Sequence, residues 1–524
     1  MSKRTRAAAA AALTVALLGA SATTPSYADP NNNTVRKLTR AVTAEGVLEH
    51  LEALQEIADE HGDRAAGRPG YRASVDYVVE QLEAAGYDPT VQEFPFTYAE
   101  ENSELERISP QPRTFVQGSE FLRNTFDSGT PEGEATGTLF VVPAADATDG
   151  CEGTDFDAMV AGQIALIQRG GCGFAIKALT AQAEGAAGVI IYNNTTGMIN
   201  MIGDATGLTI PAVFASQVAG ANLVSTPGAT VRVKVDFEAE QRTAYNVLAE
   251  TENGRDDNVV MAGAHLDSVQ DGAGINDNGS GSASLLETAI QMAKVKPTNT
   301  VRFAWWGAEE EGLLGSEYYV EQLTEEQEAD IALYLNFDMV ASPNYMFGIY
   351  DGDNSGGTAA PGFIPPGSAQ IEDVFEQFYA SRGEPSQDSE FSGRSDYGPF
   401  IAVGIPAGGL FTGAEVPKTA AEAALYGGVP GASYDPCYHQ PCDNLTGAGQ
   451  NVALYDQLRE DYTLIGNINR HALDVNSDAI ATAVLTFAYD TSTVNGEPGH
   501  PGHGLVKDSH AQQVLLEAQG RSAR

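Results

Sequence analysis

The sequence predicts an α/β fold, in which a mostly parallel central sheet is flanked by helices on both faces and a second, β-rich segment interrupts the chain. The first observation is that short, nearly continuous apolar runs alternate with helical apolar rhythm. These runs, typical of strands buried on both faces, cover residues 259–264, 301–306, 331–337 and 405–411. The second is that residues 93–242 change to many short β-type runs. Alternating strands and helices form parallel sheets covered on both sides.

The helices of the main fold are predicted from the spacing of apolar residues, and their ends from glycine and proline. A helix is expected from Val47 and a second from Val75 to near Gly86, with a Gly/Arg/Pro loop at 62–70 between them. The Gly-rich run 274–282 (GINDNGSGS) opens another helix, and further helices are expected at 371–378 and 480–488. Residues 29–40 are polar, which predicts a flexible N-terminal segment.

The inserted segment is expected to span residues 94–240, so that residues 41–93 and 241–489 form one discontinuous domain. One helix is expected at 175–184, and strands are expected at 137–143, 162–168, 188–193, 209–215 and 230–236. Both ends of such an insert must lie close together on the domain that it interrupts. The tail at 490–524 is rich in Gly, Pro, His and polar residues, which predicts a flexible segment.

The first 28 residues have the form of a signal peptide. A basic start precedes an Ala/Leu/Val run at 7–20, and Ser26-Tyr27-Ala28 is a small-residue cleavage site. We therefore expect a secreted protein cleaved near Ala28. No later stretch reaches the ~20 apolar residues that a membrane anchor needs.

The charge and the cysteines agree with an exported protein. The formal net charge of -42, from 71 acids against 29 bases, argues against nucleic acid or anionic membranes as partners. The 4 cysteines favour two disulfides, Cys151 with Cys172 and Cys437 with Cys442, although four thiols allow three pairings. Their spacings fit no common zinc finger. We expect a monomer.

Two imidazoles and three carboxylates stand in short, distinctive contexts: His265 in AGAHLDS, Asp277 in GINDNGSGS, Glu310 in WWGAEEEG, Asp338 in NFD and His439 in CYH. Zinc binds nitrogen and oxygen donors of these kinds, and two ions that share one carboxylate need five such ligands. Several of these residues fall just beyond a predicted strand, where ligands of α/β sheets gather. A single His or Asp is more often an ordinary core or surface residue, so the prediction rests on the whole set.

Two further acids adjoin these ligands. Glu309 directly precedes Glu310 and is the candidate base for a metal-activated water. Asp267 lies two residues after His265 in an extended segment, so both point to the same side and Asp267 can fix the imidazole ring. A turn aspartate is the alternative interpretation of Asp267.

These contexts, together with GRSD, GLFTGA and the GRPGYRASVDYV stretch, resemble the secreted di-zinc leucyl aminopeptidases of the aminopeptidase Y type. The resemblance covers about residues 40–93 and 241–488. It implies the fold of the zinc-dependent exopeptidases and two Zn²⁺ per chain. In that arrangement Asp277 bridges the two ions, His265 and Asp338 complete one site, and Glu310 and His439 complete the other.

The same resemblance implies the catalytic roles. Glu309 becomes the general base and acid that acts on a bridging water, and Tyr438 helps to hold the oxyanion. Arg394 and Phe411 match substrate-binding positions. The expected reaction is hydrolysis of the first bond of peptides with a free N-terminus, with a preference for large apolar, leucine-like first residues.

The inserted segment also resembles a known module. IALIQRGGCGFAIKALTAQAEGAAGVIIYNN, followed by IPAVFAS, is similar to the protease-associated domain of exported and membrane peptidases. None of its residues has the character of a catalytic group. It can serve as a lid or wall for the substrate, or it can be an insertion without a role in the reaction.

Three other functions stay open at this point. A carboxypeptidase or dipeptidase can use the same two-zinc chemistry, a cyclase or deacylase can share the scaffold, and a binding protein can keep the fold without the chemistry. Calcium is an additional expectation: Asp474 and Asp478, at helical i, i+4 spacing, can hold such an ion, although a solvated pair is the commoner meaning of that spacing.

Overall fold

The computed structural model describes residues 31–126, 129, 131–143, 148–195, 197–199, 201–360 and 362–496. The chain divides into two compact units, one containing Met1–Gln92 and Tyr245–Arg524 and the other Glu93–Ala244. The sequence placed the insert at 94–240. The predicted signal peptide and the greater part of the predicted tail lie outside the described residues.

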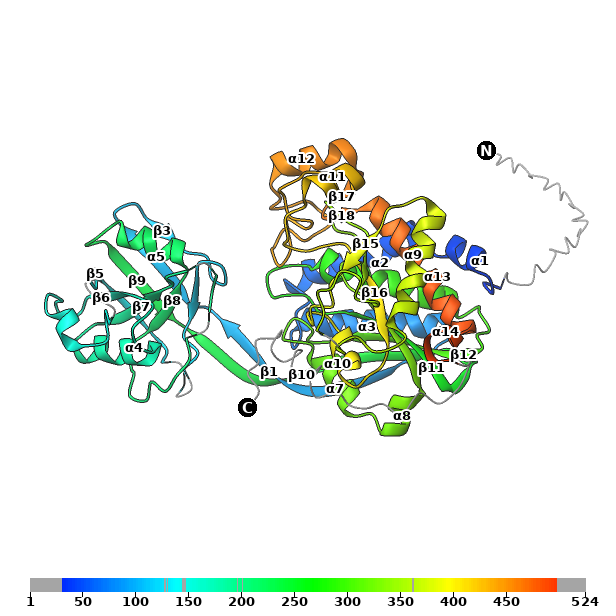
Figure 1. The fold of residues 1–524 in the computed structure, drawn as a ribbon, viewed down its shortest axis with the longest axis horizontal. Helices are drawn as coiled ribbons and strands as arrows, with labels where there is room; N and C mark the ends of the chain where they lie inside the picture. The colour runs from blue at the N-terminus through cyan, green and yellow to red at the C-terminus, as the bar shows by residue number, and fades with distance from the viewer. Residues whose placement is uncertain are drawn as a thin grey trace, which may run out of the picture. The chain divides into compact units, whose positions relative to one another are not determined.

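Six strands of the first unit and two strands that cross the sequence boundary between the units, β1 and β10, form an eight-stranded sheet with the order β1-β10-β12-β11-β13-β16-β14-β15 (Figure 1). Its strands are β1 (Thr90–Glu101), β10 (Phe237–Glu250), β11 (Arg255–His265), β12 (Asn299–Trp306), β13 (Ile331–Phe337), β14 (Gly348–Tyr350), β15 (Gln387–Ser389) and β16 (Ala407–Phe411). Pairing is parallel from β12 through β11 and β13 to β16. It is antiparallel where β10 joins β12 and where β14 joins β16. The predicted parallel centre is confirmed.

Helices cover this sheet on both faces. A group that includes α2, α3, α6 and α13 packs together, with α6 on β11 and α13 on β12, while α10 packs on β13, β16 and α7. Alternate residues of the strands fill the layer beside α10, because successive side chains point to opposite faces. The helices are α2 (Ala44–His61), α3 (Pro69–Ala85), α6 (Gly281–Met292), α7 (Leu314–Glu321), α8 (Glu325–Asp330), α9 (Ser368–Arg382), α10 (Tyr397–Ala402), α11 (Ala420–Tyr426), α12 (Val452–Asp461) and α13 (Arg470–Tyr489).

The second unit contains its own eight-stranded sheet, with the order β3-β2-β9-β5-β6-β7-β8-β4. Its strands are β2 (Glu104–Ser109), β3 (Arg113–Thr114), β4 (Phe121–Arg123), β5 (Gly133–Val141), β6 (Ile164–Gln168), β7 (Gly188–Tyr192), β8 (Ala212–Ala215) and β9 (Thr230–Val235), with helices α4 (Phe174–Ala183) and α5 (Gln217–Val224). All five predicted strands and the predicted helix are present. Cys151 and Cys172 form a disulfide in this unit.

The two chain ends differ from expectation where they are described. The segment 29–40 was expected to be flexible, but Val35–Ala41 forms α1, and Leu38 is fully buried. The tail was expected to be flexible from 490, but Ser492–Asn495 forms α14, and Thr491 accepts a hydrogen bond of 2.9 Å from Asn258. A single buried apolar residue in a polar run leaves no periodic signal, so composition alone missed both contacts.

Within the described residues, no helix combines the length and the apolar character that a membrane span requires.

Candidate metal centre

The five predicted ligands converge at one edge of the first sheet. His265 is the last residue of β11, Asp338 follows β13 directly, and Glu310 lies four residues beyond the end of β12. Because these strands are parallel, their carboxyl ends meet at the same edge. Asp277 reaches that edge from the turn η2 (Ile275–Ser280) before α6. His439 reaches it from the loop that the Cys437–Cys442 disulfide closes.

The two oxygens of Asp277 face different imidazoles. Oδ1 lies 3.3 Å from Nε2 of His265, and Oδ2 lies 3.2 Å from Nε2 of His439. His265 Nε2 is also 3.3 Å from Asp338 Oδ1, and His439 Nε2 is 3.0 Å from Glu310 Oε2. The five side chains therefore form two adjoining donor groups that share Asp277.

Glu309 lies beside this cluster without closing it. Its Oε2 is 4.0 Å from His265 Nε2, and the donor atoms of His265, Glu309 and Asp338 all lie within 4.8 Å of one another. By distance alone, Glu309 therefore belongs to the donor group of His265 and Asp338. Asp277 nevertheless approaches His265 more closely, at 3.3 Å.

Burial makes the ionised form of these clustered acids unfavourable. Burial raises the pKa of Glu309 well above its usual range; the charge of His265 opposes this shift, and the charge of Asp396 adds to it. Burial also raises the pKa of Glu310 to about 7, and the charge of Asp277 adds to this effect. Burial acts in the same direction on Asp277, but hydrogen bonds from His265 and His439 outweigh it and lower that pKa. Buried carboxylates that raise one another's pKa must be neutralised, either by a proton or by a nearby cation.

Asp267 contacts the His265 ring more closely through its backbone than through its side chain. His265 Nδ1 contacts the backbone carbonyl of Asp267 at 3.1 Å, while the Asp267 carboxylate is 3.8 Å away. That carboxylate instead accepts the backbone N–H groups of Glu309 at 3.2 Å and of Glu310 at 3.4 Å. Asp267 therefore orients the imidazole through its main chain and positions the two glutamates through its side chain.

Arg64, which the sequence did not indicate as a site residue, is fully buried against the loop between β11 and η2. Its guanidinium donates to the carbonyls of Leu266, Ala273 and Gly274, the last two at 2.7 Å. Leu266 follows His265, and Gly274 lies three residues before Asp277. One side chain thus ties together the loops that carry two of the ligands. Its only sequence signal is an arginine in the loop at 62–70.

Asp443 was also missed. Its carboxylate accepts the backbone N–H groups of Asn276 and Asp277 at 2.9 Å and 3.0 Å. Asn467 bridges Asp443 to Asp435 with hydrogen bonds of 2.8 Å and 3.0 Å. A buried polar network therefore fixes the turn that presents Asp277 to both imidazoles.

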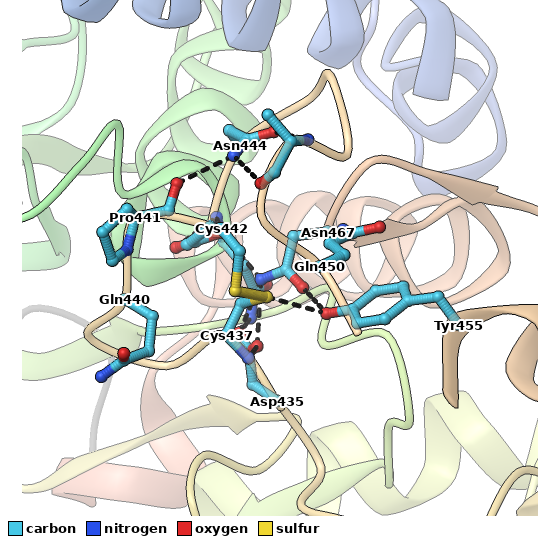
Figure 2. Close-up of a disulfide and its surroundings, with 12 residues drawn as sticks. Asp435, Cys437, Gln440, Pro441, Cys442, Asn444, Gln450, Tyr455 and Asn467 are labelled. Atoms are coloured by element: carbon cyan, nitrogen blue, oxygen red, sulfur yellow. Dashed lines mark hydrogen bonds between the residues drawn. A yellow bond between two sulfur atoms is a disulfide. The ribbon is translucent and has the colours of Figure 1, made fainter. Parts of the chain in front are cut away.

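The disulfide loop that carries His439 is attached to the same network (Figure 2). Tyr455 donates to Asn467 and lies 3.1 Å from the sulfur of Cys437, and the N–H of Cys437 donates to Asp435 at 2.8 Å. His439 itself has a left-handed backbone, with φ of 53°. Such a conformation costs a non-glycine residue about 1 kcal/mol or more, and the disulfide and its polar contacts hold it in place.

The other predicted site residues line one pocket of about 100 Å³ beside the metal ligands. Tyr438 stacks on His439, with ring centroids 3.8 Å apart. Arg394 donates to the hydroxyl of Tyr438 at 3.1 Å and to Glu415 at 2.9 Å. Phe411, at the end of β16, adds an apolar wall.

Asp338 has an additional partner in this region. The hydroxyl of Ser395 donates to Asp338 Oδ2 at 2.7 Å and accepts from the amide of Asn336 at 2.8 Å. Asp338 Oδ1 is thereby left to face His265. The GRSD segment that contains Ser395 thus orients Asp338, a predicted ligand, and also supplies Arg394 to the pocket.

The predicted calcium pair is not gathered into a cation site. Asp478 pairs with Arg382 at 2.6 Å, and Asp474 and Asp478 are absent from the described acidic groups close enough to share an ion. Outside the site at the sheet edge, the described acids that do converge are Asp351, Asp353 and Glu372.

Models of known protein families match parts of both units. The model of peptidase family M28 matches residues 246–453, and the PA domain model matches residues 135–223. The chain is 45% identical to an aminopeptidase of Pseudomonas aeruginosa (strain UCBPP-PA14) over 475 residues, which cover 88% of this chain and 84% of that protein. It is 36% identical to leucine aminopeptidase 2 of Trichophyton rubrum over 490 residues, 92% of this chain and 91% of that protein.

Solved structures agree on the architecture. The aminopeptidase from Aneurinibacillus sp. strain AM-1 matches with a TM-score of 0.56 at 27% identity, covering 91% of this chain and 98% of that chain. BSAP, a zinc aminopeptidase from Bacillus subtilis, matches with a TM-score of 0.55 at 23% identity, covering 89% and 99%. At 23% identity, the similarity to BSAP supports the fold and nothing further.

Proposed function

Because this chain belongs to peptidase family M28 and is an aminopeptidase of that family, we propose that it removes large apolar first residues from peptides with two zinc ions and Glu309 as general base and acid. The observation that carries the proposal is the position of Asp277. Its two carboxylate oxygens face His265 and His439 separately, at 3.3 Å and 3.2 Å. A shared carboxylate between two such donor groups is the arrangement that a pair of ions requires.

The donor set fits zinc. Imidazole nitrogens and carboxylate oxygens are zinc ligands, and Oε1 of Glu310 is buried without a hydrogen-bond partner in the described structure. His265 and Asp338 would hold one ion and Glu310 and His439 the other, with Asp277 common to both. When bound, the ions would polarise the substrate carbonyl and lower the pKa of a water toward ~7.

Glu309 is the proton carrier in this proposal. It would accept a proton from the water that attacks the carbonyl carbon, and it would then protonate the departing amine. Its burial favours this role, because burial raises the pKa of Glu309 and so makes its carboxylate a stronger base. The Asp267 carboxylate accepts a hydrogen bond from the backbone N–H of Glu309, and this contact restricts the positions that the Glu309 carboxylate can adopt.

Tyr438 is placed to stabilise the tetrahedral oxyanion. Its hydroxyl accepts from Arg394, so its own proton is free to be donated into the pocket. The free amino group of the substrate would meet Glu309 and Asp338, two of the acids that line the pocket. A protonated amine there is attracted to them, which favours a substrate with an unblocked N-terminus.

The apolar part of the pocket supports a preference for large aliphatic or aromatic first residues. Phe411, Met339, Tyr350 and Tyr397 are among its lining residues, and the last three are buried in the wall. A leucine side chain placed against them gains roughly 1.5–3 kcal/mol from burial. Glycine and acidic first residues gain nothing comparable.

A carboxypeptidase or dipeptidase is the weaker alternative. Either must bind a free carboxylate with basic groups, and Arg394 is the only lysine or arginine among the described lining residues. Its guanidinium is already engaged by Glu415 and Tyr438. This arrangement favours recognition of an amino end.

We also propose that the chain is exported after cleavage near Ala28. The Cys151–Cys172 and Cys437–Cys442 disulfides support this proposal, because such bonds persist in oxidising compartments outside the cytosol.

The decisive experiment measures hydrolysis of leucine 4-nitroanilide and zinc content on the same protein. We expect activity to be lost on chelation and restored when zinc reaches two ions per chain. A peptide blocked at its amino end should resist cleavage, while one blocked at its carboxyl end should be cleaved. Cleavage of the amino-blocked peptide instead would favour the carboxypeptidase.

A further inference from the structure

Glu415 pairs with Arg394, the only lysine or arginine among the described residues that line the substrate pocket. It follows the GLFTGA segment directly, and its Oε1 lies 2.9 Å from Nη1 of Arg394. The two side chains are 49% and 54% exposed, respectively. Both are therefore partly exposed, and Glu415 adjoins the pocket through Arg394 and through Ala414, the lining residue that precedes it.

This ion pair lies close to the proposed reaction centre. Arg394 donates to the hydroxyl of Tyr438, whose ring stacks on His439. Since Tyr438 is the side chain proposed to hold the oxygen of the cleaved bond, its partner Arg394 would lie near the residue that follows this bond. A carboxylate on that residue would turn to Arg394, because the other ionisable side chains that line the pocket, apart from Tyr and His, are acids: Asp277, Glu309, Glu310, Asp338 and Glu390.

We propose that Glu415 is a specificity-determining residue, which neutralises Arg394 and thereby disfavours substrates with a carboxylate directly after the cleaved bond. Such substrates are dipeptides with a free C-terminus. Longer peptides and amidated dipeptides place no charge there and are not penalised. The inference rests on the proposed aminopeptidase function, and it explains how one arginine can line the pocket without making the enzyme a dipeptidase.

The test compares kcat/KM for Leu-Leu and for Leu-Leu-amide, with leucine 4-nitroanilide as a third substrate. In the wild type the amide should be preferred. Glu415→Gln frees Arg394 and should raise kcat/KM for Leu-Leu relative to Leu-Leu-amide by roughly two- to fivefold, the scale set by a partly exposed ion pair. An unchanged ratio in Glu415→Gln overturns the inference.

The anilide separates this inference from the function on which it rests. It carries no carboxylate, so its cleavage by the wild type reports on aminopeptidase activity alone. Loss of that cleavage would remove the proposed function. Retained cleavage with an unchanged dipeptide ratio would remove only the role of Glu415.

Two controls test the ion pair itself. Glu390 is exposed and lines the same pocket, and no ion pair of Glu390 is found among the described residues. Glu390→Gln removes the same charge and should change the ratio less. In an Arg394→Gln background, Glu415→Gln should give no gain for Leu-Leu. An equal shift in Glu390→Gln, or a gain that persists without Arg394, would mean that net charge acts instead of the pair.

Discussion

Replacing Arg64 with methionine tests whether one buried guanidinium holds the metal loops together. Methionine fills similar volume but leaves the carbonyls of Leu266, Ala273 and Gly274 without their donor. A buried acceptor without a partner costs about 1–3 kcal/mol. Three such acceptors would together cost about 3–9 kcal/mol if none found another partner. The variant recovers part of this cost, because it no longer buries a charge, so we expect a net loss of about 3–5 kcal/mol.

The two tryptophans of the chain give a clean assay for this loss. Trp305 and Trp306 are both fully buried in β12 of the first unit, and the chain has 2 Trp in total. Urea unfolding followed by tryptophan fluorescence thus reports on that unit alone. Zinc titration of the same variant should show roughly 10- to 100-fold weaker binding, as for the loss of other residues that support a metal ligand.

Arg382→Met is the matched control. Arg382 pairs with Asp478 at 2.6 Å on the surface of the same unit, and its side chain is 40% exposed. Its replacement should cost at most about 1 kcal/mol and leave zinc binding intact. A loss below about 1 kcal/mol in Arg64→Met, or zinc affinity equal to that of the wild type, would refute the role assigned to Arg64.

Three other predictions follow from the site and its surroundings. Glu309→Gln should retain two zinc ions by elemental analysis yet lose about 10²–10⁴-fold in kcat, because it deletes the proton carrier and not a ligand; loss of metal would contradict this. Ser395→Ala frees Asp338 Oδ2 and should weaken zinc binding by roughly 10- to 100-fold by competition with a chelator. Burial lowers the pKa of Lys418 from 10.5 to about 8. Between those values the unfolded chain binds more protons than the folded one, so stability should rise with pH over that window. Lys418→Met should abolish this rise in urea midpoints, and a persistent rise would assign it to another group.

The strands at the metal centre were predictable because their signal is local. Val259–Ala264 and Ile331–Phe337 are apolar runs of strand length, and the ligands follow them directly in sequence. Parallel pairing then brings His265 and Asp338 to one edge without further information. Family resemblance added Asp277 and His439, which follow no strand.

The supporting residues carry no such local signal. The hydrogen-bond acceptors of Arg64 lie 202 to 210 positions further along the chain, and Asp443 reaches the N–H of Asp277 across 166 positions. Neither period nor composition links residues so far apart. The left-handed backbone of His439 was equally hidden, because a disulfide and a buried network impose it and the local sequence does not.

The contacts of Asp267 explain how two consecutive glutamates can take different roles. Glu309 and Glu310 lie in a bend and a turn after β12, where the Asp267 carboxylate accepts both of their backbone N–H groups and so fixes the local main chain. Glu310 then meets His439 at 3.0 Å, whereas Glu309 stays 4.0 Å from His265. The proposed ligand Glu310 and the proposed base Glu309 can therefore be neighbours in sequence, because the position of the main chain, and not the identity of the side chain, decides which carboxylate reaches the predicted metal site.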